Sequence, residues 1–250
     1  MFTKFCATVF SLALVATVAG AGAASATTVQ ATYTGTVANS SDMTGLFGAP
    51  GGSLDGQAFS LTYTFSTSAG FRDNAGPGAY DAVIGGTDHG VTSPTLSARL
   101  TIAGHSQTVS GATGSTYYVC DAAVCGENTA NAEAYDIHHN FPGTSTLNLI
   151  NALASGPDGA IPASLETPFA LSALNGGGNF LFQSFSTSTW SYIANTYGDL
   201  NVTNLSVAVV GVAPVPLPAA VGPFLLVLGM GGMAGFVARR RGQRGQRGQV

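Results

Sequence analysis

The chain has 250 residues, with 12 acidic side chains against eight lysines and arginines, and its formal net charge is −4. These charges are segregated, because Lys4 lies near the start, five arginines follow residue 238, and only Arg72 and Arg99 lie among the acidic residues. The stretch 27–218 therefore carries 2 − 12 = −10. Such a surface repels phosphate backbones, which argues against nucleic acid as a partner.

The N-terminus has the three parts of a secretory signal peptide. Lys4 precedes an apolar run, Phe5–Gly20, and three small residues follow at 24–26. A positive start, an apolar stretch and a small-residue cleavage site are typical of exported proteins. We predict a signal peptide here and a mature chain that begins near Thr27.

The exported region is long enough for one sizeable hydrophobic core. Apolar residues alternate with threonine and serine at 29–37, 59–65 and 96–102, and a similar pattern recurs at 202–209. A period of two with a Thr/Ser-rich outer face is typical of half-buried antiparallel strands. In the third of these strands, the pattern places Leu96 on the core face.

Glycine- and proline-rich stretches predict turns, because glycine reaches positive φ and proline presets φ. They are residues 48–52, 74–78, 156–159 and 176–179. Many strands with such turns predict an all-β fold, a single antiparallel β-sandwich or jelly-roll-like domain. The segment 130–154 fits either another strand or a short helix around 147–153.

Cys120 and Cys125 are the only cysteines of the exported region and are separated by four residues. In an oxidising compartment, two such neighbours most simply form one disulfide. A redox dithiol usually has two intervening residues, and a zinc site would need further ligands. We therefore predict a structural bridge that closes a small loop.

The densest group of metal-ligating side chains is Glu133, Asp136, His138 and His139. On a strand, Asp136 and His138 would share a face and His139 would point away. Nothing in the spacing fixes a third ligand, so the simpler interpretation is a set of polar residues at a strand end. We expect neither a metal nor a cofactor.

No nucleophile motif is present, and the abundant serines identify no catalytic one. Paired carboxylates for glycoside hydrolysis must lie about 5–10 Å apart in space, which a sequence does not define. The glutamates of the exported region are Glu127, Glu133 and Glu166. The sequence therefore favours a non-enzymatic protein, with a secreted hydrolase as an alternative.

Aromatic side chains cluster near the end of the exported region. They are Phe180, Phe182, Phe185, Trp190, Tyr192 and Tyr197. Phe180 and Phe182 should share one face of a strand, whereas Phe185 is out of phase. The simplest interpretation is the core of the last hairpin. The alternative is that Trp190, Tyr192 and Tyr197 are exposed and stack on sugar rings.

The C-terminal end combines a proline-rich linker, an uncharged apolar run and a basic tail. The run from Ala219 to Ala238 is about 30 Å long as a helix, the thickness of one hydrocarbon core. The prolines before it prevent the helix from extending backwards. The arginines after it define its cytoplasmic end. We predict a transmembrane helix with its C-terminus in the cytoplasm.

This tail resembles the PEP-CTERM sorting signals of Gram-negative bacteria, in their Val-Pro-Leu-Pro-Ala variant. Leu217 stands where the common form of the motif has an acidic residue. The residues that carry the resemblance are Val215, Pro216, Leu217, Pro218, Ala219, Arg239, Arg240 and Arg241. The resemblance implies a transient stay in the inner membrane and removal of the tail by an exosortase-type membrane protease. It also implies delivery to the outer surface or extracellular matrix. The alternative is a plain anchor without processing.

Three functional hypotheses follow from these features. The first is a non-enzymatic, surface-sorted protein of the cell envelope or extracellular matrix. The second is a lectin-like module that binds extracellular polysaccharide, and the third is the hydrolase. The expected segments are a signal peptide (1–26), the β-domain (27–212), a proline-rich linker (213–218), the transmembrane helix (219–238) and the basic tail (239–250).

Overall fold

A computed structural model describes residues 26–74, 79–140, 142–189 and 191–213, which belong to one compact unit, Ala26–Ala213. Its regular secondary structure is almost entirely β-strand, with a short 3-10 turn η1 (Thr87–His89) and a one-turn helix α2 (Ala122–Cys125). The strands are β1 (Ala26–Asp42), β2 (Ala58–Ser66), β3 (Phe71–Asn74), β4 (Tyr80–Gly85), β5 (Thr95–Ile102), β6 (His105–Val109), β7 (Gly114–Cys120), β8 (Asn128–His138), β9 (Thr144–Gly156), β10 (Phe169–Ser186) and β11 (Tyr192–Ala213).

The predicted signal peptide, sorting motif, transmembrane helix and basic tail lie outside the described residues. Within the described ranges, none of the helices has the length and apolar character needed to cross a bilayer.

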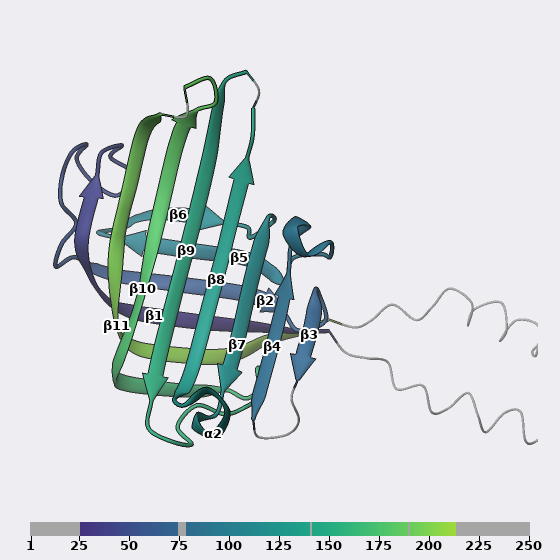
Figure 1. Cartoon of the computed structure of the whole chain (residues 1–250). Helices are drawn as coiled ribbons and strands as arrows, with labels where there is room; N and C mark the ends of the chain where they lie inside the picture. Colours follow the sequence, from purple (N-terminus) through teal and green to yellow (C-terminus); the bar gives the residue numbers. More distant parts are fainter. Residues whose placement is uncertain (1–25, 75–78, 141, 190, 214–250) are drawn as a thin grey trace, which may run out of the picture. The chain divides into compact units, whose positions relative to one another are not determined.

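All the strands belong to one antiparallel sheet, in the order β3-β4-β7-β8-β9-β10-β11-β1-β2-β5-β6. Figure 1 shows that this sheet curls over on itself, so that β1, β2, β5 and β6 run behind β7, β8 and β9 and cross them steeply. We call these two parts the back layer and the front layer. The prediction of an all-β antiparallel domain is confirmed. Where two separate sheets were expected, one sheet forms both layers, because β10 and β11 bend from one into the other.

Bulges and glycines allow the long strands to bend. The pairing of β1 with β11 shifts register at three points, and β10 shifts against β11 between Ser172 and Gly176. A Cβ on Gly178 would lie 2.3 Å from the carbonyl oxygen of Asn151, so only glycine fits at this position. The prediction of a turn at 176–179 is therefore wrong, because these glycines lie inside β10 and permit close approach of its neighbours.

The core lies between the two layers and joins them through both packing and a hydrogen bond. Tyr33, Tyr63 and Tyr117 are fully buried there. The Tyr63 hydroxyl, from β2 in the back layer, lies 2.8 Å from the carbonyl oxygen of Ile150 and 3.2 Å from that of Ala132. Both carbonyl groups belong to the front layer, so this side chain ties the halves of the sheet together.

Two long connections insert apolar side chains into this core. Phe47, between β1 and β2, packs edge-on against Phe180 and Phe182, with ring centroids 5.7 and 5.8 Å apart. Ile161 and Leu165, between β9 and β10, are also buried. These loops cover apolar surface that a curled sheet alone would leave exposed to water.

The alternation expected for 29–37 and 59–65 is confirmed in β1 and β2, where the apolar side chains are buried. Residues 147–153 form part of strand β9, so the helical alternative is wrong. Leu96 is also an exception, because it is 56% exposed instead of lying in the core. The pairing of β2 with β5 shifts register here, which places Thr95 opposite Phe65 and turns Leu96 outward.

Candidate functional site

The outer side of the front layer carries two adjacent rows of side chains that run across four strands. Inward neighbours such as Ala134, Ile150 and Leu200 are buried, and strand side chains alternate between faces. The rows are set by the register of β8, β9, β10 and β11. The first is Tyr135, Leu149, Leu181 and Tyr197; the second is Glu133, Asn151, Asn179 and Asp199. We call these eight residues, together with Tyr192, the tyrosine face.

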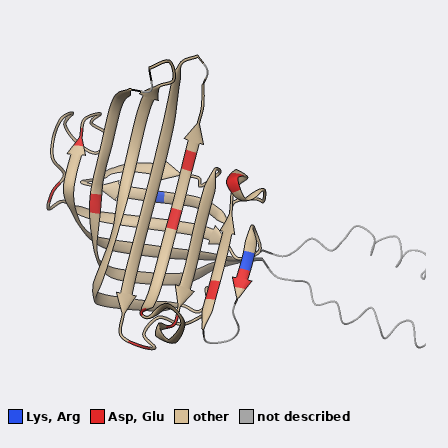
Figure 2. Cartoon of the chain, viewed as in Figure 1, with Lys and Arg blue, Asp and Glu red and all other residues tan. Residues whose placement is uncertain are grey.

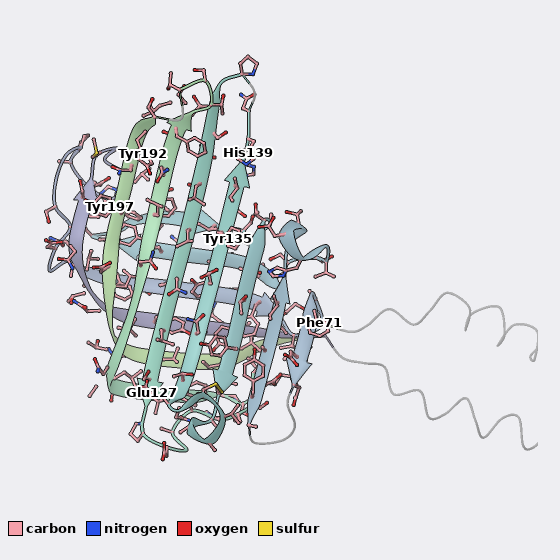
Figure 3. All side chains as sticks on the ribbon, viewed as in Figure 1. Phe71, Glu127, Tyr135, His139, Tyr192 and Tyr197 are labelled. Atoms are coloured by element: carbon pink, nitrogen blue, oxygen red, sulfur yellow. A yellow bond between two sulfur atoms is a disulfide. The ribbon has the colours of Figure 1, made fainter. Side chains whose placement is uncertain are left out.

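Two tyrosines of this face are open to solvent. Tyr192 is 74% exposed and Tyr197 is 43% exposed. Tyr192 lies opposite Phe185, just past a register shift between Ser184 and Phe185. Figure 3 shows Tyr192, Tyr197 and Tyr135 spread over the front layer. Tyr135 and Tyr197 end the same row, three strand spacings or about 14 Å apart.

Tyr135 is held flat against the sheet by its neighbours. A Cβ on Gly114, the residue opposite it on β7, would lie 2.3 Å from the tyrosine ring, so the ring covers this glycine. The Tyr135 hydroxyl donates a hydrogen bond of 2.8 Å to the carboxylate of Asp88 in η1. That bond raises the pKa of Tyr135 and keeps the hydroxyl protonated. The ring is thus positioned before any ligand arrives.

The second row supplies hydrogen-bonding groups beside the tyrosines. The Glu133 carboxylate accepts a bond of 3.3 Å from the Asn151 amide. The Asp199 carboxylate accepts one of 2.8 Å from the Asn39 amide. Each carboxylate has about four lone-pair positions, so capacity remains on both for further donors.

The tyrosine face carries carboxylates, whereas the basic residues of the described ranges lie on β3 and, behind the front layer, on β5 (Figure 2). The described residues contain two arginines and no lysine. Arg72 is paired with Asp81 and Glu166 at 2.8 and 3.0 Å. Arg99 lies on β5 in the back layer and donates to the Ser106 hydroxyl. The local field of this face is therefore negative.

The aromatic cluster predicted from the sequence is divided between two environments. Phe180 and Phe182 are buried on one face, as expected. The interpretation of the whole cluster as core is wrong for Tyr192 and Tyr197, because both project from the outer side of β11. Trp190 lies outside the described residues.

Tyr135 was not singled out from the sequence. The alternation of alanines at 130, 132 and 134 with larger residues between them is the signal that identifies its strand. That signal shows that Tyr135 faces outward, but the partner strands determine which residues join its row.

The histidine-rich group does not form a ligand set in the described ranges, where no three His, Cys, Asp or Glu side chains are placed to hold a metal. The interpretation of this group as polar residues at a strand end is wrong for Asp136, because its side chain is buried. Its carboxylate accepts bonds of 2.8 Å from the Ser110 amide and 2.6 Å from the Ala112 amide. His139 lies 3.2 Å from the Ser145 hydroxyl. Asp136 therefore fixes the connection between β6 and β7.

An open groove of about 610 Å³ lies near the connection between β9 and β10. Glu127 and Asp158 line it, together with Leu171 and Leu174. Both carboxylates are exposed, and Glu127 accepts a bond of 3.1 Å from the Ser155 hydroxyl. The groove is thus lined by both half-buried leucines and exposed carboxylates.

The predicted disulfide between Cys120 and Cys125 is confirmed, with Cα atoms 6.1 Å apart. It closes the loop that contains α2, whose N-terminus is capped by the Asp121 side chain through a bond of 2.9 Å from the Ala123 amide. The bridge therefore supports the connection between β7 and β8 at one end of the front layer.

The sorting residues, from Val215 to Ala219 and from Arg239 to Arg241, lie outside the described residues. Comparison of the chain with protein-family models, curated proteins and solved structures gives no match.

Proposed function

We propose that this chain is a non-enzymatic, surface-sorted protein of the cell envelope or extracellular matrix, and that its tyrosine face binds polysaccharide. The observation that carries the binding proposal is the pair of exposed rings, Tyr192 and Tyr197, on the same outer face as the positioned ring of Tyr135. This arrangement supports the lectin-like alternative over a purely structural role.

The chemistry of the face suits sugars in two ways. A pyranose ring presents C–H groups on its faces, and these pack on the faces of aromatic rings. Its hydroxyl groups both donate and accept hydrogen bonds, as the amides of Asn151 and Asn179 do. Stacking groups next to such amides provide affinity from one row and orientation from the other.

The half-buried leucines strengthen the case for a ligand on this face. Leu149 and Leu181 lie between the two terminal tyrosines of the first row. When a partner covers a row of aliphatic and aromatic groups on an outer sheet face, apolar surface is removed from water and the complex is stabilised. A flat, extended sugar chain laid across the strands would do so.

The carboxylates of the groove do not have the environment that hydrolysis requires. A general acid that works near neutral pH needs an apolar environment to raise its pKa. Glu127 and Asp158 are both exposed to water. We therefore assign the proposed function to the tyrosine face.

The sorting part of the proposal rests on the resemblance of the tail. The chain would remain in the inner membrane through residues 219–238 and be cut near residues 215–219 by an exosortase-type protease. The mass of the protein recovered from the cell surface tests this. A mass that lacks residues 219–250 is expected, and one that includes them would reduce the tail to an anchor.

Binding is tested with the full-length chain and soluble neutral, amino-bearing and acidic oligosaccharides, by calorimetry. The variant Tyr192→Ala/Tyr197→Ala should bind at least roughly tenfold more weakly, at about 1 kcal/mol for each ring. Phe71→Ala is the matched control, since Phe71 is 61% exposed but lies on the edge strand β3. Equal losses in both variants, or no binding to any sugar, would rule out the tyrosine face as a glycan site.

A further inference from the structure

The charge on the tyrosine face narrows the class of polysaccharide, provided that the proposed glycan function holds. We infer that the face prefers chains whose sugars carry free amino groups, such as oligomers of glucosamine, over neutral chains and over uronic acid chains. The occupant is an extended, cationic glycan that lies across β8 to β11.

The geometry places an anionic group beside each terminal ring of the first row. Glu133 lies two residues from Tyr135 on β8, and Asp199 lies two residues from Tyr197 on β11. Side chains two residues apart on a strand share a face and lie about 7 Å apart along it. A sugar stacked on either ring therefore has a carboxylate within reach of a substituent on that sugar.

Each carboxylate is oriented by a neutral neighbour and retains acceptor capacity. The amides of Asn151 and Asn39 each donate one hydrogen bond, to Glu133 and Asp199 respectively. An ammonium group offers three donors and a positive charge, which matches the positions left on these oxygens. A sugar hydroxyl matches the hydrogen-bonding positions but not the charge.

A third carboxylate adds to the negative field at the β8 end of the face. Asp88 accepts the hydroxyl of Tyr135 at 2.8 Å and is itself exposed. No lysine or arginine in the described part of the chain lies on the tyrosine face to neutralise these groups. A uronate chain on the same track would bring like charges together and would be repelled.

Local charges decide this preference, rather than the net charge of the domain. At physiological salt the Debye length is about 8 Å, so distant carboxylates are largely screened. Glu133, Asp199 and Asp88 are the ones that a ligand on the face would contact or approach. Each exposed carboxylate–ammonium contact is expected to change affinity by up to about fivefold.

The test uses the full-length chain and three oligomers of equal length: glucosamine with free amines, its fully N-acetylated counterpart, and a galacturonate. We expect affinity to fall in that order, and the advantage of the free amine to shrink as salt is raised. Because two contacts are removed, the double variant Glu133→Gln/Asp199→Asn should lose up to about 25-fold in affinity for the amine-bearing oligomer and little for the acetylated one. Asp73→Asn, an exposed carboxylate on β3, is the matched control.

The outcomes separate this inference from the function on which it rests. Equal binding of the amine-bearing and acetylated oligomers that still depends on Tyr192 and Tyr197 overturns the charge preference alone. Tighter binding of the galacturonate overturns it as well. If the parent chain binds none of the three oligomers, the glycan function itself is overturned. The same holds if the chain self-associates and this association disappears in Tyr192→Ala/Tyr197→Ala.

Discussion

The inner faces of the two layers are both lined by buried apolar side chains, but the outer faces differ in the side chains that they carry. Behind the tyrosine face, the outer side of the back layer carries hydroxyl and amide groups in rows across five strands. We call it the hydroxyl face. Its rows are Asn204, Thr34, Ser60, Thr101 and Ser106, and Ser206, Thr32, Thr62, Arg99 and Thr108.

The hydroxyl face satisfies many of its own polar groups. Thr32 and Thr62 hydroxyls lie 3.3 Å apart, and those of Thr101 and Ser106 lie 2.8 Å apart. Small β-branched side chains that bond to one another and to water suit a solvated strand surface. The tyrosine face instead has rings and leucines that a partner could cover. The alternating pattern thus builds the fold in both layers, while the outer residues of four strands form the face to which we assign the proposed binding.

The largest expected effect is a loss of stability on replacing Arg72, which we compare with Arg99 in the back layer. Arg72 makes a bidentate pair with Asp81, which is 1% exposed, whereas Arg99 is exposed on the hydroxyl face. Arg72→Met would leave a buried carboxylate without its cation and should cost about 3 kcal/mol, or roughly 6–12 °C in Tm. Arg99→Met should stay within about 0.5 kcal/mol of the parent.

Thermal unfolding of both variants checks this contrast. The double variant Arg72→Met/Asp81→Asn should recover part of the loss, because the buried charge is removed together with its partner. If Arg72→Met and Arg99→Met unfold at the same temperature, the network at the edge of the front layer contributes nothing to the stability of the fold.

The next effect concerns the bond that ties the layers together. Tyr63→Phe removes the hydroxyl that bridges from β2 to the carbonyl oxygen of Ile150, so the cost should be about 1–2 kcal/mol. Tyr118→Phe is a suitable control, since Tyr118 lies on the outer side of β7 and is half-buried. Denaturant unfolding gives both values, and equal stabilities would mean that packing alone holds the layers.

Local alternation made much of this architecture predictable. The buried side of β2 follows directly from residues 59–65, because adjacent side chains on a strand point to opposite faces. The position of Leu96 did not follow, since a bulge depends on how β5 pairs with β2. The glycines at 176–178 were mistaken for a turn for a similar reason, because their role is to admit neighbouring strands.

The candidate site was predictable only at one end. Tyr192 and Tyr197 were candidates for sugar stacking, and their exposure agrees with that alternative. Tyr135 lies 62 residues before Tyr197 in the chain, and the two share a row only through the register of three strand pairs. No local pattern contains that information.

A smaller effect is expected for a glycine beside the tyrosine face, Gly114 opposite Tyr135, than for the changes above, and Gly211 opposite Thr28 is its counterpart beside the hydroxyl face. Gly114→Ala would place a methyl group 2.3 Å from the ring of Tyr135 and displace it, at a stability cost of about 1 kcal/mol. Glycan affinity should fall as much as in Tyr135→Ala. Gly211→Ala, on β11 beside Thr28, has ordinary space for a Cβ and should change neither property. Unchanged binding in Gly114→Ala would show that the ring position does not matter.

The smallest effect is a pH dependence at the end of β1, a strand of the hydroxyl face whose last residues pair with β11 beside Tyr197. β1 begins in the hydroxyl face and ends at Asp42, opposite Thr196 and next to the pair formed by Ser41 and Tyr197. Burial raises the pKa of the Asp42 carboxyl, but hydrogen bonds from Thr196, Phe47 and neighbouring amides outweigh burial and hold the pKa below its ordinary value. The folded chain therefore binds fewer protons at this carboxyl than the unfolded chain does.

That difference fixes the sign of the pH effect. The stability from Asp42 is fully present above the unfolded pKa of about 4 and is lost as the pH falls through the lower, folded pKa. Asp42→Asn should therefore be less stable at neutral pH and should lose less stability on acidification than the parent. Asp158→Asn, at an exposed turn, should follow the parent curve. Denaturant unfolding at a series of pH values measures all three curves. If Asp42→Asn and the parent lose stability in parallel, the hydrogen bonds to this carboxylate do not anchor the loop that carries Phe47 into the core.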